Sequence, residues 1–155
     1  MLMELEFSKI LSWIKTTIVH LYEPEFIAIT PNFTINEILS GEYMAFGLSG
    51  NPSRTQMIGG DVTVAWMDHN TGKGYAEDYY LDAKSQCAGT RGSCPDSNLA
   101  LGRNDVKLLN SAIINEFTML TYRRPLDKDD QYDSAILTNQ SQAVIWAMGP
   151  INSKV

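Results

Sequence analysis

An alternating segment in the middle of the chain most constrains its fold. Within residues 61–67, apolar side chains occupy every second position, which is the period of a half-buried β-strand. Residues 69–74 supply asparagine and two glycines, a composition typical of a turn. Residues 75–81 then return with aromatic side chains, which favour strands. We therefore expect an antiparallel hairpin here.

The other short apolar segments continue this pattern. Further strand candidates lie at residues 26–29, 33–39, 43–48, 105–109, 112–114, 117–122 and 143–148. Glycine, proline or polar residues separate most of them, and no helical pattern intervenes after residue 25. Short strands at close spacing favour an antiparallel sheet over a parallel α/β sheet. The predicted fold class is therefore all-β, an antiparallel β-sandwich.

The first 22 residues carry a different pattern. Their apolar side chains fall mostly at three- and four-residue spacings, and Glu23-Pro24 follows, so we expect a short N-terminal helical segment. This gives an appended segment at residues 1–24 and a domain at residues 25–153. Glutamates occupy positions where a secretory signal would be positive. If the protein is extracellular, the lack of a clear signal peptide leads us to expect that the chain is a fragment of a longer protein or that its start is misassigned.

Composition excludes some functions. The chain has 155 residues, 44% of them hydrophobic, which suffices for one domain with a core. Its net charge of −6 argues against nucleic-acid binding, which normally needs a basic surface. No apolar run reaches the roughly 18 residues expected of a transmembrane span.

The only two cysteines, Cys87 and Cys94, enclose a loop of small and polar residues. Such a loop gives no packing reason to bury thiols, so we interpret them as a disulfide and infer an oxidising compartment. Reduced surface thiols are the alternative, whereas a metal site lacks a second Cys/His pair. Sequons at Asn32 and Asn139 agree with an extracellular or cell-surface location, and Asn139 is the better glycosylation candidate.

Several motifs together resemble a known family. They are residues 43–49, Met57 to Val62 with the strand ending at Trp66, residues 122–126 and 145–150, and the cysteine-bearing stretches 79–87 and 91–96. This set resembles the DOMON domain of the Skeletor/Knickkopf type, found in arthropod proteins that also carry DM13 modules. The resemblance covers residues 41–153. It implies an immunoglobulin-like β-sandwich, in agreement with the strand pattern.

The resemblance also implies a ligand. DOMON domains typically bind haem b or sugars, and in the haem-binding members a methionine at the position of Met57 supplies one axial ligand. A histidine just beyond the last strand supplies the second, and this chain contains none there. His20 lies outside the resemblance and His69 lies in the predicted hairpin turn. On sequence alone, the favoured interpretation of Met57 is a packed methionine beside a glycine turn, and only the resemblance makes haem contact an equal alternative.

Aromatic residues of the central hairpin offer a sugar-binding alternative. The candidates are Trp66, Tyr75, Tyr79 and Tyr80. Their rings could stack on sugars while Glu77 and Asp78 accept hydroxyl hydrogen bonds. Ordinary sheet packing is the competing interpretation, and we favour it for Trp66. Because side chains alternate along a strand, Tyr79 and Tyr80 point to opposite faces.

Evidence for catalysis is weak. Asp129, Asp130 and Asp133 form an acidic cluster, which we interpret as a solvated loop. The chain lacks the Gly-x-Ser-x-Gly nucleophile elbow and the phosphate-binding Gly-Lys-Ser/Thr ending. We therefore expect a module that is not an enzyme by itself but serves as a redox or binding part of a larger protein.

The resemblance places that larger protein in the organisation of cuticle and chitin. Expected partners are chitin or another carbohydrate, cuticle proteins or a redox partner. The alternative is a cofactor-free structural interaction module, such as a matrix or spindle-matrix scaffold.

Overall fold

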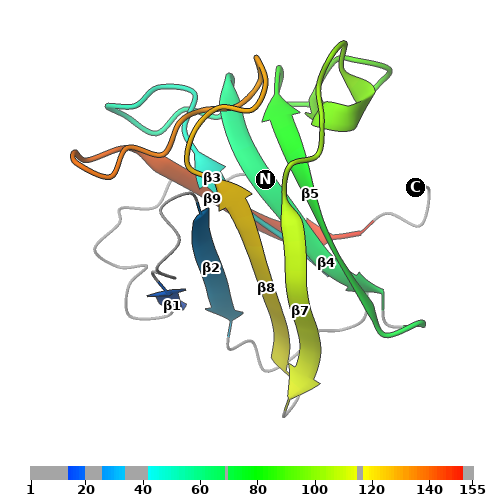
Figure 1. The fold of residues 1–155 in the computed structure, drawn as a ribbon. Helices are drawn as coiled ribbons and strands as arrows, with labels where there is room; N and C mark the ends of the chain where they lie inside the picture. The colour runs from blue at the N-terminus through cyan, green and yellow to red at the C-terminus, as the bar shows by residue number, and fades with distance from the viewer. Residues whose placement is uncertain (1–13, 20–25, 34–41, 69, 115–116, 152–155) are drawn as a thin grey trace.

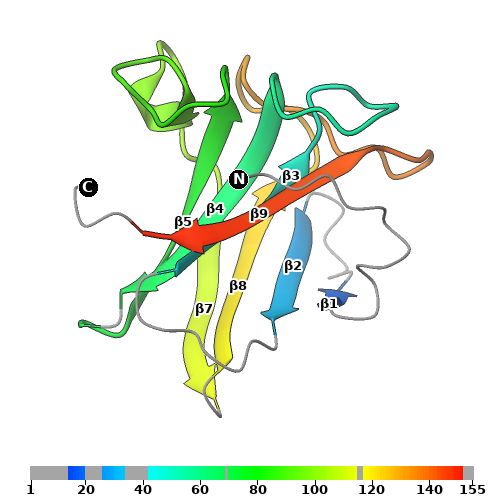
Figure 2. The same ribbon diagram turned by 180° about the vertical axis from the view of Figure 1, so that it is seen from behind.

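The structure is a computed structural model of the chain and describes residues 14–19, 26–33, 42–68, 70–114 and 117–151. Within them, nine strands and one 3₁₀ turn form two antiparallel sheets that lie one against the other (Figures 1 and 2). The prediction of an all-β sandwich is confirmed.

Each sheet has a simple order of strands. The four-stranded sheet runs β1 (Ile14–Val19), β2 (Phe26–Phe33), β8 (Phe117–Pro125) and β7 (Lys107–Ile114). The five-stranded sheet runs β6 (Ser93–Pro95), β5 (Lys73–Leu81), β4 (Gly60–Asp68), β3 (Glu42–Leu48) and β9 (Val144–Pro150). The turn η1 (Asp96–Asn98) follows β6 directly.

The predicted central hairpin is the β4–β5 pair, which aligns without a register shift. Its inner face contacts the four-stranded sheet. There the small side chains of Ala65 and Ala76 pack with Leu120 and Tyr122 of β8, each 1% exposed. Two alanines on one layer leave room for the larger side chains of the other, so the sheets approach closely.

The N-terminal helix prediction is wrong where the structure describes that segment. Residues 14–19 form β1, which pairs antiparallel with β2. Five of its six residues are β-branched, and such side chains lose rotamer freedom in a helix but fit a pleated strand. The rest of the predicted helix lies outside the described residues, and the division at residue 24 stays a prediction.

Two strand boundaries also differ. Residues 26–29 were expected to end before Pro31, but β2 continues through Pro31 to Phe33, with Pro31 opposite Thr16. Residues 105–109 and 112–114 were expected as separate strands, but one strand, β7, spans residues 107–114 with a register shift between Leu108 and Asn110. Such a bulge keeps a strand paired across an extra residue. The strand expected at residues 33–39 lies largely outside the described residues.

Three long connections gather at one end of the sandwich. They are residues 49–59, 82–106 and 126–143, and they lie opposite the β4–β5 and β7–β8 turns (Figure 1). No helix in the described part of the chain is long and apolar enough to cross a membrane.

Candidate functional site

The outer face of the five-stranded sheet carries a continuous set of aromatic and apolar side chains. We call it the aromatic face; it comprises Tyr43, Met57, Val64, Trp66, Tyr75, Glu77, Tyr79 and Ile145. All of these side chains are partly buried. This face points away from the four-stranded sheet, and β9, which pairs with β3, crosses in front of β3 and β4 in the view of Figure 2.

An aromatic pair forms one end of the aromatic face. Trp66 and Tyr75 are register partners, and their rings stack with centroids 5.1 Å apart and an interplanar angle of 10°. Lys73 Nζ lies 5.0 Å from the centroid of the Tyr75 ring, within cation–π range. Trp66 therefore packs against its register partner on the outer face of the five-stranded sheet.

The middle of the aromatic face holds a partly buried carboxyl group. Burial raises the pKa of Glu77. Burial, then the charges of Glu77 and Tyr43, raise the pKa of Tyr79. Glu77 and Tyr79 lie on β5, and Tyr43 lies on β3 at the other side of β4. The predicted partner Asp78 is absent from this face, because it is fully buried on the inner face. Tyr80 also points away from the aromatic face, and its ring centroid lies 5.4 Å from that of Tyr132.

Met57 lies at the other end of the aromatic face, in a tight turn. Gly60 N–H donates to the Met57 carbonyl at 2.8 Å, and Gly59 N–H donates to the Leu81 carbonyl at 2.8 Å. Gly59 has φ +82°, which glycine adopts without strain. The turn therefore fixes Met57 beside β5, where its side chain packs against the apolar cluster that includes Val62 and Leu81.

A haem needs more than this turn supplies. Met57 offers a thioether on an apolar face, which suits one axial position. The two histidines, His20 and His69, both lie outside the described residues. The described part of the chain thus provides one candidate axial ligand and no imidazole, and it does not complete a haem site.

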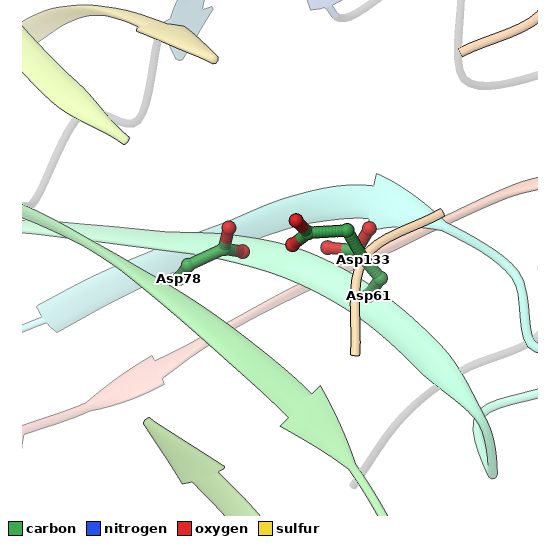
Figure 3. A group of neighbouring side chains, drawn as sticks. All are labelled: Asp61, Asp78 and Asp133. Carbon is green, nitrogen blue, oxygen red and sulfur yellow. The ribbon is translucent and has the colours of Figure 1, made fainter. Parts of the chain in front are cut away.

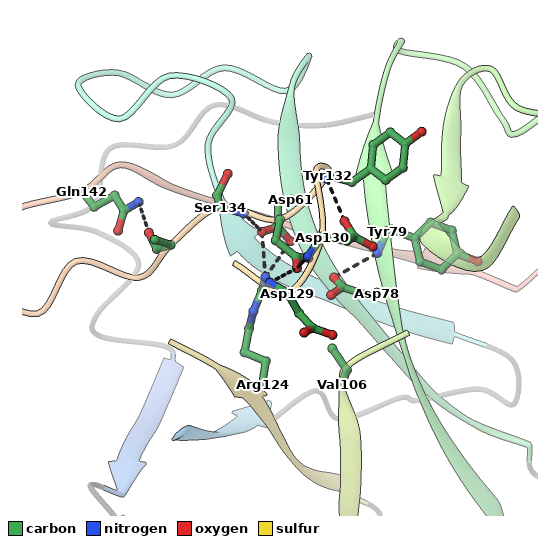
Figure 4. A network of polar contacts seen from close by, with 12 residues as sticks. Asp61, Asp78, Tyr79, Val106, Arg124, Asp129, Asp130, Tyr132, Ser134 and Gln142 are labelled. Atoms are coloured by element: carbon green, nitrogen blue, oxygen red, sulfur yellow. Dashed lines mark hydrogen bonds and ion pairs between the residues drawn. The ribbon is translucent and has the colours of Figure 1, made fainter. Parts of the chain in front are cut away.

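The inner face carries a buried ion pair that the sequence analysis missed. Arg124 Nη2 of β8 donates to Asp61 Oδ1 at 2.8 Å and Oδ2 at 2.7 Å, so the pair joins the two sheets (Figure 4). Ser134 N–H donates to Asp61 Oδ2 at 2.6 Å. Burial disfavours the charged guanidinium, but Asp61 and Asp78 outweigh that cost and raise the pKa of Arg124.

Asp61, Asp78 and Asp133 approach one another beside Arg124, with ligand oxygens within 4.8 Å (Figure 3). This group is poorly suited to a metal ion, because Arg124 already occupies both oxygens of Asp61. Burial raises the pKa of Asp78 to about 10, with Arg124 opposing and Asp61 and Asp105 adding to the shift. The raised pKa favours the protonated form of Asp78, which reduces repulsion in the buried group.

The structure contains the expected Cys87–Cys94 disulfide, with a Cα–Cα distance of 4.7 Å. It closes the loop before β6, and Cys94 is buried. Asn139 is exposed in the connection before β9. Asn32 lies within β2, which pairs with β1 on one side and with β8 on the other. Glycosylation of either residue stays a prediction.

Comparison with known proteins identifies relatives of this arrangement. A family profile described as DOMON domain matches residues 27–149. Protein Skeletor, isoforms B/C, of Drosophila melanogaster is 46% identical over 110 residues, which is 71% of this chain and 14% of that protein. A cytochrome b561, DM13 and DOMON domain-containing protein of Arabidopsis thaliana is 32% identical over 121 residues, 70% of this chain and 13% of that protein. The chain therefore spans a small part of the relatives it matches.

Proposed function

The chain belongs to the DOMON domain family, and from this premise we propose that it is an extracellular module that binds carbohydrate on its aromatic face. The observation that carries the proposal is the set of aromatic rings and one carboxylate on a single open sheet face. Trp66 and Tyr75 supply stacking surface, and Tyr79 lies beside Glu77. Apolar ring faces combined with a few polar groups are what sugar recognition uses.

The shape of the face favours an extended sugar chain. The β4 strand runs from Gly60 to Asp68, about 27 Å at the usual rise per residue. Aromatic side chains lie along this length on three adjacent strands. The family resemblance of the sequence leads us to expect a polysaccharide of the cuticle, such as chitin, and the disulfide agrees with the extracellular setting that this ligand requires.

Two adjacent tyrosines give a matched test. Tyr79→Ala removes a ring from the aromatic face, whereas Tyr80→Ala removes the same ring from the opposite face. We expect Tyr79→Ala to weaken binding to chitin and to soluble chitooligosaccharides about tenfold, which corresponds to one aromatic contact of about 1.4 kcal/mol. Tyr80→Ala should bind as the unmodified chain does. Equal binding by both variants, with folding confirmed by circular dichroism, would refute the proposal.

Met57 favours a second function, haem binding for electron transfer. Its support is the placement of the thioether on the apolar part of the aromatic face, and a relative whose name includes cytochrome b561. When bound, a haem with a methionine ligand supplies one-electron redox chemistry. Met57 would hold the iron on one side, while the apolar side chains around it would exclude water.

The haem function is tested by titrating the chain with haemin and recording the visible spectrum. A shifted Soret band that is lost in Met57→Leu, but kept in Met148→Leu on the exposed part of β9, would support haem binding. An unshifted Soret band would refute it. If the sugar and haem tests both fail, a cofactor-free interaction module is the function that stays consistent with the fold.

A further inference from the structure

Three acidic side chains meet where two of the long connections lie together. Asp96 begins η1, and Asp130 and Asp133 lie in the connection after β8. One carboxylate oxygen of each lies within 4.8 Å of the others. The sequence predicted a solvated acidic loop at residues 129–133, but Asp133 is 4% exposed and Asp96 is 1% exposed. That interpretation is wrong for Asp133.

The buried carboxylates leave oxygens without partners. Asp96 Oδ1 and Asp133 Oδ1 are buried and have no hydrogen-bond donor. The other Asp133 oxygen, Oδ2, accepts from the Asp129 and Asp130 N–H groups at 2.7 Å each. A buried, unpaired charged oxygen is costly, so these two oxygens require a positive ligand or a proton.

No basic side chain of the described residues fills that role. The guanidinium of Arg103 turns to Asp129, with Nη2 2.7 Å from its carbonyl oxygen and 3.0 Å from Oδ2. Only the backbone N–H of Arg103 contacts Asp130, at 2.8 Å. The guanidinium of Arg124 is bonded to Asp61. Burial, followed by repulsion from Asp130, Asp61 and Asp133, raises the pKa of Asp96 to about 7, and a backbone hydrogen bond from Tyr80 opposes this shift.

We propose that Asp96, Asp130 and Asp133 form a Ca²⁺ site that ties η1 to the connection after β8. The donor atoms are all oxygens, which selects a hard cation. Calcium–oxygen distances are about 2.3–2.6 Å, so oxygens on opposite sides of one ion lie about 4.6–5.2 Å apart. The three carboxylate oxygens lie within 4.8 Å of one another, close enough for one ion to contact all of them. Mg²⁺ dehydrates reluctantly and usually keeps several waters, so a site of protein carboxylates favours Ca²⁺.

The local backbone holds the carboxylates in place before any ion binds. Asp130 Oδ1 accepts from Tyr132 N–H at 2.7 Å, while Asp133 Oδ2 accepts from the N–H groups of Asp129 and Asp130. The Tyr132 hydroxyl donates to the Ala100 carbonyl at 3.2 Å, which connects the same two chain segments. Because these contacts order the loop, an ion that binds there should stabilise the folded protein in proportion to its concentration.

The test is calorimetric titration of the decalcified 155-residue chain with CaCl₂, together with thermal unfolding. We expect one ion per chain and a melting temperature that rises with Ca²⁺ concentration, with a smaller rise for MgCl₂. Asp96→Asn and Asp130→Asn should each weaken Ca²⁺ binding about tenfold or more. Asp127→Asn, an exposed aspartate of the same connection, removes an equal charge and should change the affinity by less than about twofold.

A purely structural role of Asp96 gives a different result. If Asp96 binds Ca²⁺, Asp96→Asn should melt no lower than the unmodified chain in a chelator, because one repelling charge is gone, and lower than it in CaCl₂. A loss of stability that is equal in both conditions would overturn the proposal. So would an absence of binding heat at millimolar CaCl₂, or an equal loss of affinity in Asp127→Asn.

Discussion

Replacement of Arg124 by methionine tests whether the buried ion pair holds the two sheets together. Methionine keeps the length and the apolar stem of arginine but removes the charge and both hydrogen bonds to Asp61, at 2.8 and 2.7 Å. The Arg124 and Asp61 side chains are 4% and 1% exposed. The variant therefore leaves a carboxylate in the core without its counterion.

The cost follows from this burial. Breaking a buried pair by removing one partner costs about 3–5 kcal/mol, because the remaining charge is desolvated and unpaired. In a domain of this size, 1 kcal/mol shifts the melting temperature by roughly 2–4 °C. We therefore expect Arg124→Met to lower the melting temperature by roughly 6–20 °C.

The assay is urea unfolding followed by tryptophan fluorescence, in a chelator so that bound metal does not contribute. Arg123→Met is the matched control, because Arg123 directly precedes Arg124 in β8 and points to the other face of the strand. It should cost less than Arg124→Met, because Arg123 is less buried. The double variant Asp61→Asn, Arg124→Met should cost less than the sum of the single variants, since it removes both charges. A loss below about 1 kcal/mol for Arg124→Met, or strict additivity in the double variant, would refute the reasoning.

Three further predictions concern other parts of the fold. Replacing Cys87 and Cys94 by serine should lower the free energy of unfolding by about 2–3 kcal/mol, because the disulfide restricts the conformations of the unfolded chain by closing a short loop. The measurement is urea unfolding, and an unchanged midpoint would contradict this. The pKa of Glu77 is raised in the folded state, so its ionisation destabilises the unmodified chain as the pH rises above 4.5, the ordinary pKa. The free energy of unfolding of Glu77→Gln should therefore increase relative to that of the unmodified chain over this pH range; a difference that is constant with pH would argue against it. Gly47→Ala should destabilise more than Gly72→Ala in thermal unfolding, because the new Cβ of Gly47→Ala would overlap the Asp61 carbonyl. At Gly72 nothing lies within 4 Å, and only the φ of +68° opposes alanine. The reverse order would exclude the close approach.

The central hairpin was predictable because its pattern has one interpretation. Alternation over residues 61–67 at a period of two fits only a strand, and the glycine-containing turn requires the chain to return. Residues 14–19 lacked this clarity. Their apolar spacing matches a helix, while their β-branched content matches a strand, and pairing with β2 decided the outcome. Local patterns cannot supply that pairing, since the partner is distant in sequence.

The candidate site was predictable in part for a related reason. Alternation correctly separated Tyr79 from Tyr80, but it did not say which face of the sheet is covered. Val62, Val64 and Trp66 are apolar, so they resemble the core side of β4, yet the four-stranded sheet covers the side that bears Asp61 and Thr63. A buried carboxylate on the covered side is tolerated only because Arg124 arrives from β8, about 60 residues later in the chain.

Alternation also gives the two faces of β4 and β5 separate tasks. Asp61 and Asp78 lie on the inner face with Arg124, and Tyr79 lies on the outer face with Glu77. If the ion pair only holds the sheets together, Arg124→Met should lower stability without changing the affinity of the folded molecules for chitooligosaccharides. Binding measured well below the melting temperature should then match the unmodified chain, whereas Tyr79→Ala loses affinity at every temperature. A loss of affinity in Arg124→Met under those conditions would mean that the inner charges also set the geometry of the aromatic face.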